Sequence, residues 1–170
     1  MMVRASCLLL CVLGLLQTEK AERRQPMPEA IVGTWSVSRE IPTKTISCWG
    51  KEDAKKLIRT ELQYSDKLFR WDKTTIENPV VEIRTVTASE FHDENSGAGP
   101  HGAEISLPEL GINSDSVTEI AIKHSPGHLF TETIEIPGDD VIVKDSATIV
   151  FAVCNVYFEA KRVHKDKKDK

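Results

Sequence analysis

The sequence has few cysteines and only one long apolar run, and it lacks the common catalytic motifs. The apolar run, Ala5–Leu16, spans 12 residues, whereas a transmembrane helix needs about 20. Charged residues interrupt every later apolar stretch. We therefore expect no membrane span after the first segment has been removed.

No local motif for catalysis or cofactor binding is present. The chain has no Gly-x-Ser-x-Gly elbow, no His-Glu-x-x-His, no phosphate-binding loop and no dinucleotide fingerprint. We accordingly assign no catalytic residue, no metal ligand and no cofactor. Because catalytic groups can be distant in sequence, an enzyme stays open as an alternative.

The N-terminus has the features of a cleavable secretory signal. Arg4 provides a positive start, and Ala5–Leu16 has the length of a signal-peptide core. We predict a signal peptide over residues 1–21, whose cleavage point stays open, and a secreted, periplasmic or extracellular protein.

The body of the chain is acidic. Residues 22–160 contain 14 Lys and Arg against 23 Asp and Glu, a net charge of about −9. Such a balance argues against nucleic acid as a partner.

Two cysteines, Cys48 and Cys154, lie beyond the signal. An exported protein meets an oxidising compartment, in which thiols pair. We predict a disulfide between them, while two separate thiols are the alternative.

Short alternating and β-branched runs dominate the rest of the chain. The domain organisation that we predict is a linker over residues 22–30, a β domain over 31–163 and a basic tail over 164–170. One amphipathic helix is expected near residues 51–61. Many short strands joined by turns, such as Cys154-Asn155, are typical of a sandwich or a barrel.

The first strand opens with Gly33-Thr34-Trp35, and the last one ends at Arg162. This pair of features resembles the lipocalin-like (calycin) barrels, in which a Gly-x-Trp motif opens the first strand and a late arginine lies over the tryptophan. The C-terminal stretch also resembles that of a group of small exported bacterial proteins of unknown function. The resemblance implies a mainly β fold, a single antiparallel lipocalin-like β-barrel with one short N-terminal helix. It implies structural roles for Gly33, Trp35 and Arg162, with Trp35 and Arg162 in cation–π contact.

The strand predicted near residues 130–136 supplies candidate ligand-binding residues. Phe130, Glu132 and Ile134 alternate on one face, and a carboxylate among apolar groups could orient a ligand inside a barrel. The alternative is that Glu132 lies at the rim or pairs with a cation.

The segment Phe91–Glu104 is rich in Gly and charged residues, and we predict an exposed, mobile loop there. Its residues His92, Asp93, Glu94 and His101 could hold a metal, but consecutive side chains rarely converge on one ion, so we interpret them as solvated.

The leading functional hypothesis is a secreted, non-catalytic binding protein. Its partner would be a small apolar molecule in the barrel or an extracellular protein on the surface. The alternatives are a hydrolase-type enzyme using the 91–104 loop, and an extracellular inhibitor or envelope interaction protein.

Overall fold

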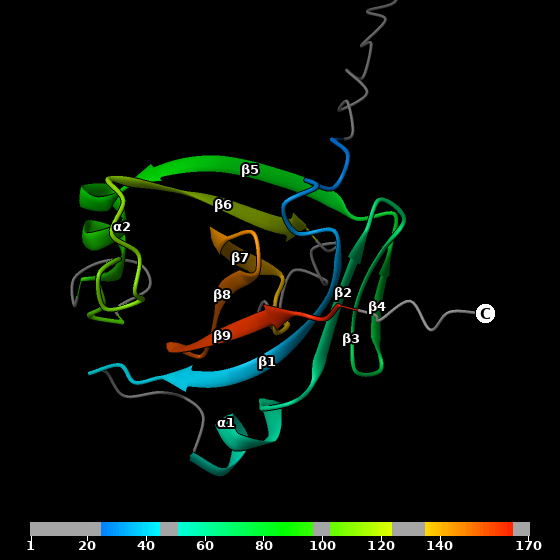
Figure 1. The fold of residues 1–170 in the computed structure, drawn as a ribbon, viewed down its shortest axis with the longest axis horizontal. Helices are drawn as coiled ribbons and strands as arrows, with labels where there is room; N and C mark the ends of the chain where they lie inside the picture. The colour runs from blue at the N-terminus through cyan, green and yellow to red at the C-terminus, as the bar shows by residue number, and fades with distance from the viewer. Residues whose placement is uncertain (1–24, 45–50, 97–102, 124–134, 165–170) are drawn as a thin grey trace, which may run out of the picture.

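The computed structural model describes residues 25–44, 51–96, 103–123 and 135–164 (Figure 1). These residues form one antiparallel sheet in which the strands follow the order β4-β3-β2-β1-β9-β8-β7-β6-β5. The strands are β1 (Gly33–Ile41), β2 (Glu61–Ser65), β3 (Leu68–Trp71), β4 (Thr74–Glu77), β5 (Val80–Thr87), β6 (Ser116–Lys123), β7 (Asp140–Asp145), β8 (Thr148–Val153) and β9 (Val156–Arg162). The helices are α1 (Lys51–Leu57) and α2 (Ala88–Asn95), and neither is long enough to cross a membrane.

The sheet curls into a half-barrel and does not close, so the prediction of a closed barrel is wrong (Figure 1). The opening lies between β4 and β5, which are consecutive in the chain but stand at opposite ends of the sheet. Only Asn78 and Pro79 separate them. A type I′ hairpin turn needs a positive φ at both central residues, and proline cannot adopt one. The Asn78-Pro79 link therefore cannot form such a turn between β4 and β5.

The predicted two-residue hairpin between β8 and β9 is confirmed, and it differs from the Asn78-Pro79 link. Cys154 and Asn155 both have positive φ, 51° and 62°, as a type I′ turn requires. Cys48 lies outside the described residues, so the disulfide with Cys154 stays a prediction. The Thr43 hydroxyl donates to the Asn155 carbonyl (3.0 Å), which brings the chain leading to Cys48 beside the turn that carries Cys154.

The first and last strands pair, and the predicted contact between Trp35 and Arg162 is confirmed. Arg162 lies 4.1 Å from the centre of the Trp35 ring. Its guanidinium also donates to the carbonyls of Val32 (2.5 Å) and Ala30 (2.6 Å). A Cβ on Gly33, whose φ is +132°, would lie 3.0 Å from that guanidinium, which explains why glycine stands there.

Side chains fill the inner face of the curl. Trp35, Phe69 and Phe158 are completely buried, and the ring pairs Tyr64–Phe69 and Phe151–Phe158 stack at 5.1 and 5.4 Å. The remaining buried members of this inner core include Met27, Ile31, Val37, Leu62, Ile120, Val141, Ile149 and Ala160. Met27 shows that the residues predicted as a linker contribute to the core.

A second core covers the outer face of β5–β9, and the loop predicted over Phe91–Glu104 is wrong for its first five residues, while residues 97–102 lie outside the described residues. Residues 88–95 form α2, and Phe91 is 1% exposed. Thr87 and Glu90 form a capping box, and the buried Val86 and Phe91 occupy the positions of a hydrophobic staple. Buried residues of the segment 103–112 complete this outer core, namely Ala103, Ile105, Leu107, Leu110 and Ile112.

The turn before β7 bridges one end of the curl. Tyr64 on β2 donates to the Gly138 carbonyl (2.8 Å). Gly138 has a φ of +84°, and a Cβ there would lie 2.6 Å from the Tyr64 hydroxyl and 2.9 Å from Leu62. Position 138 therefore requires glycine for both its backbone and its packing.

We predict that Gly138→Ala lowers the free energy of unfolding by about 2–4 kcal/mol, because backbone strain and overpacking add. Gly111→Ala is the control, since Gly111 also has a positive φ (+74°) but its nearest neighbour is the flexible end of Lys144. That control should cost about 1 kcal/mol. Urea melts of the two variants check the prediction, and equal losses would contradict it.

Candidate functional site

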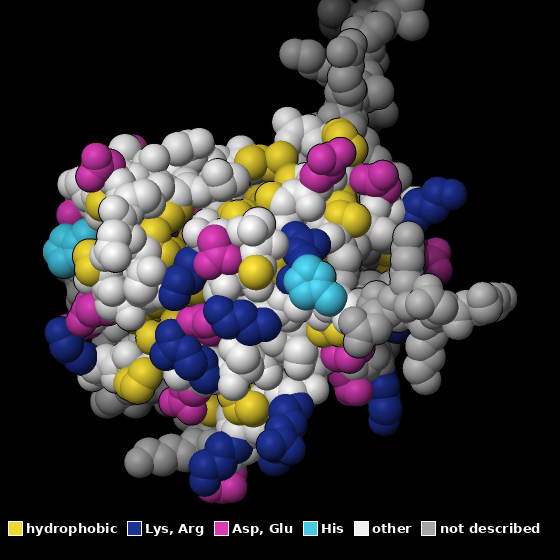
Figure 2. All heavy atoms as spheres, viewed as in Figure 1, with side chains coloured by type: hydrophobic (Ala, Val, Ile, Leu, Met, Phe, Trp, Pro, Cys, Tyr) yellow, Lys and Arg dark blue, Asp and Glu magenta, His cyan; other side chains and the backbone are white. Residues whose placement is uncertain are grey.

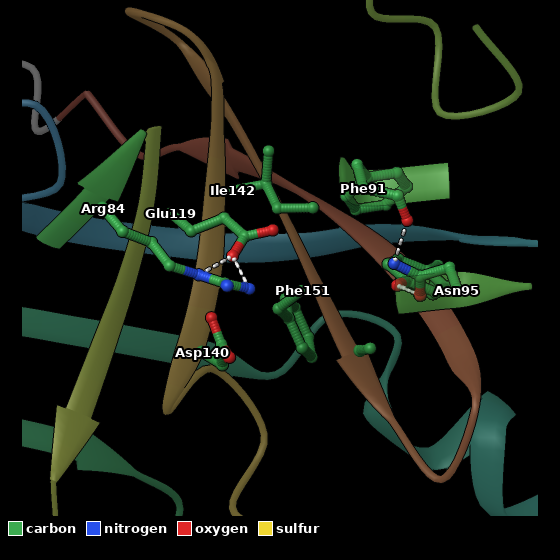
Figure 3. A pocket seen from close by; sticks show the side chains of 9 residues that line it. Arg84, Phe91, Asn95, Glu119, Asp140, Ile142 and Phe151 are labelled. Carbon is green, nitrogen blue, oxygen red and sulfur yellow. Dashed lines mark hydrogen bonds and ion pairs between the residues drawn. The ribbon is translucent and has the colours of Figure 1, made fainter. Parts of the chain in front are cut away.

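The candidate ligand residues from the sequence, Phe130, Glu132 and Ile134, lie outside the described residues. The inner face they were expected to line is occupied by the aromatic core described above. Attention therefore moves to the outer face of the sheet, where a small cavity lined by both apolar and charged residues lies at the margin of the outer core (Figure 3).

This cavity has a volume of about 60 Å³. Strands β5–β9 and helix α2 all contribute to its wall (Figure 3). Its lining consists of Arg84, Phe91, Asn95, Glu119, Asp140, Ile142, Phe151, Ala152 and Tyr157. A space of this size, with charged groups in its wall, suits a few water molecules or the tip of one side chain.

Two carboxylates hold the Arg84 guanidinium. Its Nε donates to Glu119 Oε2 (2.7 Å), and its two Nη atoms donate to the two oxygens of Glu94 (2.8 and 2.6 Å). The hydrogen bonds that Arg84 donates to Glu94 and Glu119, and the negative charges of both carboxylates, raise the pKa of Arg84. The Glu119 side chain is only 9% exposed, so this pairing offsets the cost of burying its charge.

A hydrogen-bonded chain ties β9 to α2 across the cavity. The Tyr157 hydroxyl donates to Asn95 Oδ1 (2.6 Å), and Asn95 Nδ2 donates to the Phe91 carbonyl (2.9 Å). Burial raises the pKa of Tyr157, and the charges of Glu119 and Asp140 raise it further. Tyr157 therefore stays protonated and fixes one wall of the cavity.

A larger pocket of about 290 Å³ adjoins the cavity and shares Asp140, Ala152 and Tyr157 with it. Its other described lining residues are Ala103, Ala121, Ile122, Lys123, Glu135, Asp139 and Asn155. We call the two spaces together the outer groove. Four carboxylates (Glu119, Glu135, Asp139 and Asp140) line it, against two cations (Arg84 and Lys123).

The strand pattern carried a signal for this site that our sequence analysis did not use. On β6, Val117, Glu119 and Ala121 alternate with the inner-core residues Ile120 and Ile122. The same reasoning that selected Glu132 applies to Glu119. By contrast, Glu94 reaches Arg84 and Asn95 reaches Tyr157 only because both lie on α2, and this helix was not predicted.

His92 and Asp93 lie exposed on α2, and His101 lies outside the described residues. In the described ranges, no group of three His, Cys, Asp or Glu side chains is placed to hold a metal.

Comparisons of the chain with protein-family models, curated proteins and solved structures give no match. The functional argument therefore rests on the geometry of the chain itself.

A second charged cluster lies on the same face, around Glu159. Glu159 is 4% exposed, and three cations surround its carboxylate. It accepts hydrogen bonds from Arg39 (2.6 Å) and forms ion pairs with Lys161 (2.7 Å) and Lys144 (3.4 Å). Burial alone would raise its pKa, but the hydrogen bonds from Lys161 and Arg39 and the charge of Lys144 lower it to about 2. Lys144 also donates to the Leu110 carbonyl (2.9 Å), so this cluster anchors the outer core.

Charges of both signs are interspersed over the face of the molecule shown in Figure 2. Ion pairs in the described residues follow this distribution, as at Lys123–Glu82 (2.7 Å) and Lys44–Glu109 (3.3 Å). The outer groove is distinguished by its excess of carboxylates.

The Glu159 cluster predicts a loss of stability in acid. Since the folded-state pKa of Glu159 is lowered, its contribution is complete above pH 4.5, the ordinary value, and is lost as the pH falls toward 2. Glu159→Gln should be less stable than the parent at pH 7 by about 1–3 kcal/mol. The difference should shrink between pH 4.5 and 2, as measured by urea melts. A difference that does not change over this range would refute the assignment.

Proposed function

We propose that this chain is an exported, non-catalytic binding protein whose outer groove receives a positively charged side chain, lysine or arginine, of an extracellular protein partner. The observation that carries the proposal is the excess of carboxylates in a groove that also has apolar walls. Export is inferred from residues 1–21 of the sequence.

The charge of the groove favours a cation over an anion. Arg84 is held by Glu94 and Glu119, and Lys123 lies 2.7 Å from Glu82 Oε2. Both cations of the groove are therefore already neutralised by carboxylates. An incoming ammonium or guanidinium group would meet a negative potential, which also speeds encounter.

The apolar part of the lining matches the stem of a long basic side chain. Phe91, Ile142 and Ala152 lie close to the carboxylates. Lysine and arginine bury their methylene groups against apolar surface and keep their charged ends beside polar groups. The volume of the larger pocket, about 290 Å³, is near the lower end of the range for small-molecule sites.

The walls of the groove are held in place before a partner arrives. The chain from Tyr157 through Asn95 to Phe91 links the sheet to α2, and Arg84 links β5, β6 and α2. Such preorganisation lowers the entropic cost of binding.

The scaffold that presents the groove supports a lipocalin-like relationship as part of this proposal. It rests on the Gly33-x-Trp35 opening and on the contact of Trp35 with Arg162. The filled inner face favours a partner on the outside over an apolar ligand in the interior.

The test is isothermal titration with N-acetyl-lysine amide and N-acetyl-arginine amide, each against the parent and Asp140→Asn. Asp140 is exposed and lines both parts of the groove. We predict that the substitution weakens binding about fivefold, or ~1 kcal/mol, and that salt weakens binding to the parent.

Asp72→Asn is the matched control, because Asp72 is exposed in the turn between β3 and β4, away from the groove. Its positive φ of 48° is one that asparagine tolerates. Equal dissociation constants for the parent and Asp140→Asn would contradict the proposal, as would equally tight binding of N-acetyl-glutamate amide.

A further inference from the structure

Strand β5 is a long edge with exposed apolar residues. It stands last in the sheet, and the described residues provide no strand on its other side. The large hydrophobic side chains exposed in the described part of the chain are Val32, Val80 and Ile83. Val80 and Ile83 both belong to β5, and each is 42% exposed.

The other edge of the sheet is protected in a way that β5 is not. Strand β4 has four residues, whereas β5 has eight. Proteins usually keep unpaired edges short, because a long edge offers its backbone groups to another chain. The length and the apolar residues of β5 together indicate that a strand covers it.

The side chains of β5 are complementary to those of a second β5 running antiparallel. Residues directly opposite each other in an antiparallel pair point to the same face. With Ile83 opposite Ile83 of a second copy, the inner faces of the two sheets become continuous. Val80 then lies opposite Val86 of the second copy, so both exposed residues gain apolar neighbours.

Charge selects this register over its neighbours. Centred on Ile83, the pairing places Glu82 opposite Arg84 of the second copy, and the two-fold axis repeats this pair. A pairing centred on Glu82 would place two glutamates opposite each other, and one centred on Arg84 would do the same with two arginines. Like charges directly opposite destabilise a sheet.

We propose that the protein forms a symmetric dimer in which β5 pairs antiparallel with β5 of a second copy, about a two-fold axis at Ile83. The two sheets then join into one across the dimer. This inference concerns the edge of the sheet and stands apart from the binding of a cation in the outer groove, so either can fail alone.

The test is disulfide trapping of the mature protein at single introduced cysteines. Across the proposed axis, the two Cα atoms of residue 83 lie about 5 Å apart, which is within the range of a disulfide. Ile83→Cys should therefore give a covalent dimer on a non-reducing gel. Thr85→Cys is the matched control, because its counterpart lies about 13 Å away along the strand, and it should run as a monomer.

Sedimentation equilibrium provides the second measurement. The parent should sediment as a dimer, with a Tm that rises with protein concentration. Ile83→Lys should sediment as a monomer that still unfolds cooperatively, with a Tm independent of concentration, because Ile83 is exposed in the single chain. A monomeric parent, a dimer that survives Ile83→Lys, or trapping at residue 85 as efficient as at residue 83 would overturn the proposal. If β5 instead pairs with a strand of a different protein, the purified parent would be a monomer.

Discussion

The pairing of β1 with β9 is the constraint on which the rest of the structure depends. These strands join the two ends of the domain over a register that runs from Trp35–Arg162 to Ile41–Tyr157. Without this pairing, β1–β4 and β5–β9 would be separate antiparallel sheets, each with an uncovered face. Arg162 reinforces the joint, because it covers Trp35 and satisfies two carbonyls of the chain before β1.

Joining the two halves gives each face of the sheet a different role. The inner face has become a core of stacked aromatic and aliphatic residues, while the outer face combines a smaller core with charged clusters. Two of these clusters contain a nearly buried carboxylate, Glu119 or Glu159. Arg84 holds Glu119, while Arg39, Lys144 and Lys161 hold Glu159. The Arg84–Glu119 pair belongs to the wall of the outer groove, whereas the Glu159 cluster anchors the outer core.

The sequence predicted those features that depend on local pattern. Local patterns placed the start of the first strand at Gly33 and the end of the last strand at Arg162, as in β1 and β9, and Asn155 marked the hairpin between β8 and β9. The contact of Trp35 with Arg162 followed from the resemblance to lipocalin-like barrels. Helix α2 was missed because the charged residues before Ser96 and the glycines after it outweighed a capping box at Thr87-x-x-Glu90 that was readable in the sequence.

Closure of the barrel and the site itself could not be read from the sequence, since both depend on contacts between distant residues. A barrel closes only if its edge strands meet, and the Asn78-Pro79 link directs β5 away from β4. Arg84 and Glu119 are 35 residues apart, and Tyr157 and Asn95 are 62 apart. No spacing rule connects such pairs until the strand order is known.

Native-state hydrogen exchange tests the central claim most directly, namely that the β1–β9 pairing unites the two halves of the sheet. The account predicts that amides in β1 and β9 exchange only through global unfolding, with the same opening free energy as protected amides in β2 and β8. That free energy should equal the value from denaturant melts. Exchange of β1 and β9 at a clearly lower free energy than β7 and β8 would show that the halves unfold separately and would contradict the account.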